Sequence, residues 1–128
     1  SYLDLGIGGV VGLVEENKET DSAIREIKEE IGLDIINEET IKESSKFTSI
    51  GKFFYRDHKV AVWSYVYILS ITPEVASQIT FSDGEVESVE WLSINEIVGK
   101  IKKDEKITPD SVECFYYYLD NRKYEKKI

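Results

Sequence analysis

The stretch Arg25-Glu26-Ile27-Lys28-Glu29-Glu30-Ile31-Gly32-Leu33 decides the fold, because its charged and apolar residues repeat with the period of a helix. On a helix of about 100° per residue, three carboxylates fall within roughly 100° of one another: Glu26, Glu29 and Glu30. A separate apolar stripe consists of Ile24, Ile27 and Ile31. The stretch therefore predicts a helix that packs on a core through its isoleucines and presents an acidic face.

The acidic face has two interpretations. Like charges at positions i, i+3 and i+4 of a helix repel one another by about 0.2–0.5 kcal/mol per pair. A hard divalent cation converts that repulsion into coordination, and carboxylates are ligands that Mg²⁺, Mn²⁺ and Ca²⁺ prefer. A charged run on a helix is more often simply a solvated face. The glutamates alone leave both interpretations open.

The residues before the helix extend the pattern. Gly9 is followed after five residues by Glu15, and Glu15 after nine residues by the helix stretch. This arrangement resembles the Nudix box, written G-x5-E-x7-REUxEExGU with U aliphatic, and fills its fixed positions with Gly9, Glu15, Arg25, Glu26, Ile27, Glu29, Glu30, Gly32 and Leu33. The gap of nine residues replaces one of seven, which a longer surface loop accommodates at small entropic cost. A register that restores seven would put Val11 and Asn17 at fixed positions, and we reject it.

The resemblance implies an enzyme that hydrolyses a nucleoside diphosphate linked to another group, with a divalent cation, Mg²⁺ or Mn²⁺, shielding the pyrophosphate. Carried onto the matching positions, it implies that Glu29 and Glu30 are metal ligands. Glu26 would be a further ligand or the base for the attacking water. The carbonyl group of Gly8 would complete the coordination.

The resemblance also implies two supporting roles. Arg25 would orient the acidic side chains with Glu15 as its ion-pair partner, and direct phosphate binding by Arg25 is the weaker alternative. A further acid usually comes from a distal loop, and the candidates in this chain are Glu85, Glu87 and Asp83. We favour Glu85 as a metal ligand because it precedes Val86 as in the family pattern.

The whole chain predicts an α/β fold. Strands are expected over residues 47–56, 60–71 and 86–92, with a polar turn at 56–59, and further helices over 94–102 and from Pro109 onward. Both faces of 60–71 are apolar, which indicates a central strand covered on two sides.

Thr20, Asp21 or Ser22 would cap the first helix, Gly32 would follow its last residue, and Ser93 would cap the helix at 94–102. The charged tail at 121–127 is expected to fray.

The resemblance implies a single Nudix domain over 1–128, an α/β/α sandwich around a mixed sheet. It implies a preceding strand that this sequence lacks. Another segment could fill the place of that strand, or an unfilled sheet edge could pair with a second chain as a homodimer.

Two other functions stay open. Residues 2–9 and 108–111 resemble a Nudix subgroup near the isopentenyl-diphosphate isomerases, but Val10 stands where those isomerases have a histidine, and Cys114 is far from the glycine loop. A non-catalytic ligand-binding Nudix module is the second alternative. Retention of the box glutamates favours hydrolysis of a small pyrophosphate-containing molecule over both.

The amino-acid composition limits the kinds of partner that we expect for this chain. The 128 residues carry a net charge of −9 and one cysteine. Such an acidic balance argues against nucleic acid, and the chain has no run of ~18 apolar residues that would span a membrane. A cytoplasmic location is the default expectation.

In the strand at 60–71, Trp63, Tyr65 and Tyr67 could stack on a base, although strand aromatics mostly belong to a core. Arg56 and Lys59 could contact phosphate, although charges in turns are usually only solvated.

Overall fold

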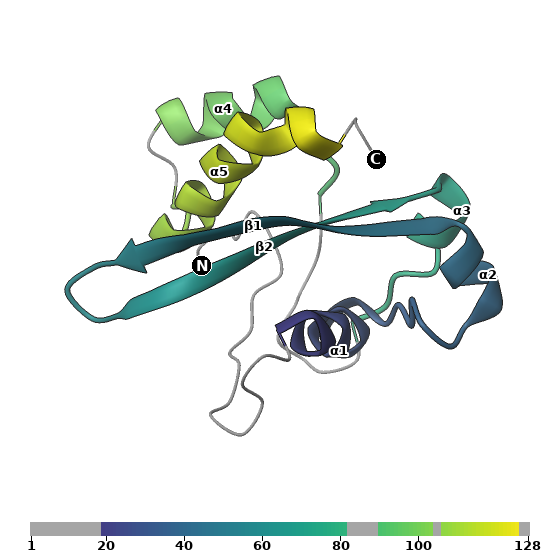
Figure 1. Ribbon diagram of the computed structural model, residues 1–128. Coiled ribbons are helices and arrows are strands. Elements are labelled where there is room, and N and C mark those ends of the chain that lie inside the picture. Colours follow the sequence, from purple (N-terminus) through teal and green to yellow (C-terminus); the bar gives the residue numbers. More distant parts are fainter. Residues whose placement is uncertain (1–18, 82–89, 104–105, 126–128) are drawn as a thin grey trace. The chain divides into compact units, whose positions relative to one another are not determined.

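The structure is a computed structural model that describes residues 19–81, 90–103 and 106–125 (Figure 1). In chain order its elements are α1 (Glu19–Ile31), α2 (Glu39–Glu43), β1 (Ser45–Arg56), β2 (Ala61–Ile71), α3 (Pro73–Ala76), α4 (Ile94–Lys102) and α5 (Pro109–Glu125). Strands β1 and β2 form a two-stranded antiparallel hairpin. The described residues thus combine helices with a sheet, as expected for an α/β fold.

The described residues divide into two compact units, and the hairpin contributes to both. The α1 unit comprises residues 19–51 and 67–81. The α5 unit comprises residues 52–66, 90–103 and 106–125. We describe each unit by itself.

The core of the α1 unit forms where the isoleucine stripe of α1 meets the open end of the hairpin. Its buried members are Ile27, Ile31, Leu33, Ile35, Ile41 and Val75, with Phe47 and Leu69 of the hairpin packed against them. Leu33 and Val75 are completely buried. Full burial of one such side chain stabilises by about 1.5–3 kcal/mol, so this cluster fixes α1 against the sheet.

Helix α1 ends at Gly32 as the sequence predicts. Gly32 has φ +72°, the left-handed conformation that closes many helices, and its amide donates to the carbonyl of Lys28 at 3.0 Å. The amide of Thr80 donates to the carbonyl of Ile31 at 3.0 Å. Lys28 also pairs with Asp34 at 3.3 Å between Nζ and Oδ2. The end of the helix is therefore held by the segments that follow it.

The α5 unit packs the tip half of the hairpin against α5, beside which α4 lies (Figure 1). The rings of Phe53 and Tyr117 stack with centroids 5.5 Å apart. Asp57 shapes the turn by accepting hydrogen bonds from the amides of Lys59 and Val60. The polar turn expected at 56–59 is thus confirmed.

Local signals set both helices of this unit. Ser93 caps α4 with its hydroxyl on the amide of Glu96, while the Glu96 carboxylate accepts from the amide of Ser93. Pro109 occupies the first position of α5, where its missing N–H costs nothing. The predicted starts of both helices, at Ser93 and Pro109, are confirmed.

Four expectations need correction. Thr20, Asp21 and Ser22 do not cap α1, because the helix already begins at Glu19. Helix α5 continues to Glu125 instead of fraying from residue 121. Strand β2 is not covered on both faces at the tip, where Val62, Trp63 and Tyr65 are exposed. Residues 90–92, the described end of the strand expected over 86–92, are irregular.

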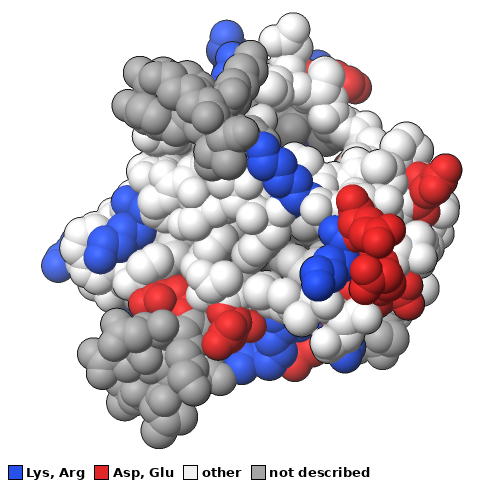
Figure 2. All heavy atoms as spheres, turned by 45° about the vertical axis from the view of Figure 1, so that its right-hand side comes forward, with Lys and Arg blue, Asp and Glu red and all other residues white. Residues whose placement is uncertain are grey.

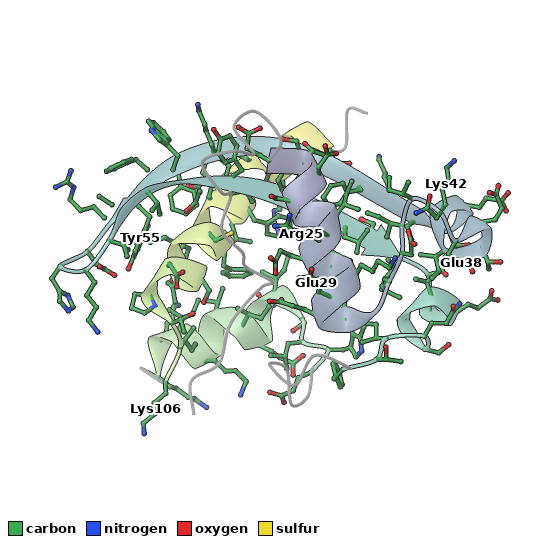
Figure 3. All side chains as sticks on the ribbon, turned by 90° about the horizontal axis from the view of Figure 1, so that it is seen from below. Arg25, Glu29, Glu38, Lys42, Tyr55 and Lys106 are labelled. Atoms are coloured by element: carbon green, nitrogen blue, oxygen red, sulfur yellow. The ribbon has the colours of Figure 1, made fainter. Side chains whose placement is uncertain are left out.

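Tyr55 gives the α5 unit a testable pH dependence. Its side chain is 7% exposed and points toward α5 (Figure 3), and its hydroxyl donates to Asp57 Oδ2 at 2.8 Å. That hydrogen bond first, then burial, and then the negative charges of Asp57, Asp110 and Glu113 raise the pKa of Tyr55 to about 12. The folded state therefore holds this proton more tightly than the unfolded state, in which the pKa of tyrosine is about 10.

We expect the contribution of Tyr55 to stability to be complete below about pH 10 and to be lost as pH rises toward about 12. The variant Tyr55→Phe should therefore lose free energy of unfolding less steeply than the parent over this interval. Urea denaturation at a series of alkaline pH values measures the slope. Tyr116→Phe, at an exposed tyrosine of α5, is the control. Equal slopes for Tyr55→Phe and the parent would contradict the assignment.

Candidate active site

Helix α1 carries the four described candidates for catalysis. Figure 3 shows Arg25 and Glu29 projecting from the same side of the helix. The side chain of Glu29 is 54% exposed and that of Glu26 is 20% exposed, whereas Glu30 is buried at 9%. The exposed fraction thus rises from Glu30, next to the core, through Glu26 to Glu29.

Arg25 joins this face by ion pairs. Its Nη2 lies 3.9 Å from Oε1 of Glu26, and its Nε lies 3.9 Å from Oε1 of Glu29. Nη2 also donates to the hydroxyl of Ser22 at 3.5 Å. The arginine therefore stands between two of the three carboxylates.

Helix stability does not explain this arrangement. Glu29 and Glu30 lie in the last turn of α1, where the negative end of the helix dipole disfavours carboxylates by about 0.3–1 kcal/mol each. Arg25 precedes Glu29 at i, i+4, the less favourable order for an ion pair on a helix. Exposed pairs of this kind contribute about 0.2–1 kcal/mol at most. The acidic face therefore weakens its helix, which is typical of residues retained for binding or catalysis.

The oxygen donors of this face suit Mg²⁺ or Mn²⁺. Within the described ranges, no group of three or more His, Cys, Asp and Glu residues is gathered closely enough to hold a metal ion alone. Mg²⁺ does not need such a cage, because it usually binds to one or two carboxylates and completes its shell with water and substrate phosphates. Glu26 and Glu29, both partly exposed, meet that requirement. The donor set thus fits a divalent cation held jointly by protein and substrate.

Several expected site residues cannot be placed. Gly8 and Glu15, and the three candidates for the distal acid, Glu85, Glu87 and Asp83, lie outside the described residues.

The single histidine and the single cysteine both lie in the α5 unit. His58 is exposed in the hairpin turn. Cys114 is a half-buried free cysteine in α5, and burial raises the pKa of its thiol. Neither His58 nor Cys114 lies in the α1 unit.

Sequence reasoning missed the residues that hold the acidic helix in place. Ser22, expected as a cap, instead accepts a hydrogen bond from Arg25, and the i, i+3 spacing of the two could have revealed this. The hydroxyls of Thr20 and Tyr67 are 3.1 Å apart, which ties the first turn of α1 to β2. Thr80 holds the last turn. These two long-range contacts have no local signal in the sequence.

The surface carries mixed charge. Figure 2 shows lysine and arginine side chains interspersed with acidic ones on one face of the described residues. Among those residues no helix is long and apolar enough to cross a membrane.

The comparison with known families is consistent with this geometry. Residues 6–123 match the family model described as the NUDIX domain. The match includes all of α1 and extends over most of the chain. No curated protein matches the chain. The match identifies a family, and does not distinguish the subgroup near the isopentenyl-diphosphate isomerases.

Proposed function

Because the chain belongs to the Nudix family, whose members generally use divalent cations to hydrolyse pyrophosphate bonds, we propose that it is a Mg²⁺-dependent or Mn²⁺-dependent pyrophosphohydrolase. The substrate class is a nucleoside diphosphate linked to another group, or a similar small metabolite. We propose one catalytic domain over residues 1–128.

One observation carries the proposal: α1 retains an acidic face that costs helix stability. Arg25 lies 3.9 Å from both Glu26 and Glu29, and Glu29 stands in the last turn of α1, where carboxylates are disfavoured. Carboxylates that cost helix stability are expected where they hold a cation, and hydrolysis of a pyrophosphate needs such a cation. Hydrolysis therefore accounts for these residues better than ligand binding alone.

We assign the roles as follows. Glu29 and Glu30, with the Gly8 carbonyl and Glu85, would hold the cation, and Glu26 would bind it or accept the proton of the attacking water. When bound, the cation would shield the pyrophosphate charge, polarise a phosphoryl oxygen and lower the pKa of a bound water. Arg25 would keep Glu26 and Glu29 oriented toward the site. Their partial exposure leaves room for a phosphate oxygen beside them.

A substrate panel tests this proposal. Nucleotide sugars, dinucleoside polyphosphates and nucleoside triphosphates are incubated with the protein, and phosphorylated products are separated by ion-exchange chromatography. We expect release from at least one compound with Mg²⁺ or Mn²⁺, and none with EDTA. Cleavage that is unaffected by EDTA would contradict the cation dependence. Binding of one compound without cleavage under any metal would instead identify a ligand-binding module.

A further inference from the structure

The tip half of the hairpin presents one face on which every residue is exposed. Strand side chains alternate between two faces, and the exposed face consists of Lys52, Phe54 and Arg56 from β1 and Ala61, Trp63 and Tyr65 from β2. Trp63 is 57% exposed. We name these six residues the aromatic face. Large aromatic residues are unusual on a solvated face, because burying one in a core removes about 150–250 Å² of its surface from water.

The opposite face of the same strands packs within the α5 unit, except at Val62, which is exposed. Phe53 stacks on Tyr117 of α5, and Tyr55 and Val66 are buried. The aromatic face is therefore not the side through which the hairpin packs within the α5 unit. Its rings need another explanation than the core of that unit.

The aromatic face is ordered by contacts between rings and cations. The rings of Phe54 and Trp63 meet edge to face with centroids 5.3 Å apart. Lys52 Nζ lies 4.9 Å from the ring centre of Trp63 and 5.6 Å from that of Tyr65. Arg56 lies 5.6 Å from the ring of Phe54. Such cation–π contacts hold flexible cations beside the rings, so that charge and ring surface are presented together.

The charge of this segment is opposite to that of the chain. Residues 52–66 contain three cations, Lys52, Arg56 and Lys59, against the single acid Asp57, which gives a net charge of +2 where the chain as a whole has −9. Asp57 is occupied by the hydroxyl of Tyr55 and by two amides of the turn. The segment therefore favours an anionic partner.

We propose that the aromatic face binds single-stranded nucleic acid, with bases stacked on its rings and phosphates beside Lys52 and Arg56. Aromatic side chains interleaved with cations on an open surface are how proteins bind single strands without sequence preference. The expectation from whole-chain charge was no nucleic-acid partner, and that average conceals this local reversal.

The dimensions favour a short strand over a single nucleotide. From Lys52 to Arg56, β1 rises by about 13 Å, at about 3.3 Å per residue, and three rings lie over this length, Phe54 on β1 and Trp63 and Tyr65 on β2. A mononucleotide would cover one ring and would lack the concave pocket that small ligands normally occupy. An acidic peptide would satisfy the cations but would offer few flat rings to stack on Phe54, Trp63 and Tyr65.

Fluorescence anisotropy of a labelled oligo(dT) or oligo(U) strand, titrated with the full chain in EDTA at about 50 mM salt, tests the proposal. EDTA prevents metal-dependent hydrolysis, so the result does not depend on the proposed enzymatic activity. We expect saturable binding that weakens as salt rises. Trp63→Leu, which keeps an apolar side chain but removes the stacking surface, should weaken binding about 5-fold to 100-fold.

The matched control is Trp91→Leu, because Trp91 is also exposed, at 69%, but lies outside the hairpin. It should bind as the parent does. Lys52→Gln should reduce the salt dependence, by about 0.7 in the slope of log K against log salt for each lost phosphate contact, whereas Trp63→Leu should leave that slope unchanged. In Trp91→Phe, Trp63 is the only tryptophan, and its fluorescence should be quenched on binding.

Four outcomes would overturn the proposal: no binding at low salt by correctly folded protein, equal weakening in the variants of Trp63 and Trp91, tighter binding of an acidic peptide than of the strand, or equal binding of heparin and the strand. The last would identify charge alone as the cause. Circular dichroism verifies the fold of each variant, and Tyr65→Leu repeats the test if Trp63→Leu fails to fold.

Discussion

Replacing Glu29 by glutamine should lower pyrophosphate hydrolysis by about 100-fold or more, while the protein stays folded. Glu29 is proposed to hold the cation that acts on the phosphate, and loss of one group that stabilises a transition state typically costs about 10²–10³ in rate. Glutamine keeps the size of the side chain and removes the charge that a cation requires. The rate of product release under saturating Mg²⁺, on whichever substrate the panel identifies, measures the effect.

Glu29 is the sharper choice among the three glutamates. Glu30 is buried, so its replacement could disturb the core and lower activity by unfolding. Glu29 is more than half exposed and pairs with Arg25 only at 3.9 Å. Removing its charge also relieves the unfavourable position in the last turn of α1. We therefore expect Glu29→Gln to be at least as stable as the parent, within about 0.5 kcal/mol.

The combination of unchanged stability and lost activity is what separates a catalytic from a structural role. Glu113→Gln is the matched control, because Glu113 is an exposed glutamate in the middle of the long helix α5. It should retain the activity of the parent. A Glu29→Gln variant with full activity would remove Glu29 from the site, and equal losses in Glu29→Gln and Glu113→Gln would indicate a nonspecific effect of charge.

The elements predicted correctly are those with strong local signals. Ser93 with Glu96 three residues later forms a capping box, and Pro109 begins a helix, because each satisfies backbone groups within its own turn. Gly32 ends α1 because only a residue that adopts positive φ readily fits there. Such features need no knowledge of the distant chain.

The missed elements depend on contacts distant in sequence. Thr20 looks like a helix cap, but its hydroxyl lies 3.1 Å from that of Tyr67, a contact across 47 residues. Helix α2 is only five residues long, too short for a periodic pattern, and Ile41 anchors it in the core. Trp63 has the pattern of a core residue, yet the hairpin uses its other face for packing. Tertiary structure decides all three cases.

The candidate site likewise combines features that the sequence predicts with features that depend on distant contacts. The spacing of Arg25, Glu26 and Glu29 predicts one helix face, and the structure places the three side chains together on α1. Spacing cannot predict the burial of Glu30 at 9%, since this depends on what packs against the helix. Nor can it predict that Ser22 binds Arg25 instead of the helix end. The residue types and their spacing predict the chemistry of the acidic face, whereas the contacts that hold this face in place depend on the fold.

Replacing Gly32 by alanine should destabilise the protein by about 1–3 kcal/mol, because two costs combine at this position. Gly32 has φ +72°, which costs a residue with a Cβ atom about 1–2 kcal/mol. A Cβ atom there would clash with the hydroxyl oxygen of Thr80, so that side chain would have to rotate away. Urea denaturation measures the change in the free energy of unfolding.

Gly99→Ala is the matched control, and it should have the opposite sign. Gly99 lies inside α4, and a Cβ atom there would meet nothing within 4 Å. Alanine in a helix interior is favoured over glycine by about 0.5–1 kcal/mol. The same chemical change should thus stabilise at one site and destabilise at the other. Destabilisation of similar size at both positions would mean that added volume, and not backbone conformation, is responsible.

The double variant Gly32→Ala, Thr80→Ala separates the two costs. If the clash with the Thr80 hydroxyl contributes, Gly32→Ala should cost less in the Thr80→Ala background than in the parent, and the difference is the steric share. The remainder belongs to the positive φ angle. Thr80→Ala keeps the backbone amide that donates to the carbonyl of Ile31, so this double variant removes the clash and leaves that contact with the end of α1 in place. A fall in hydrolysis in Gly32→Ala beyond the unfolded fraction would mean that the last turn of α1, where Glu29 lies, depends on the conformation at Gly32.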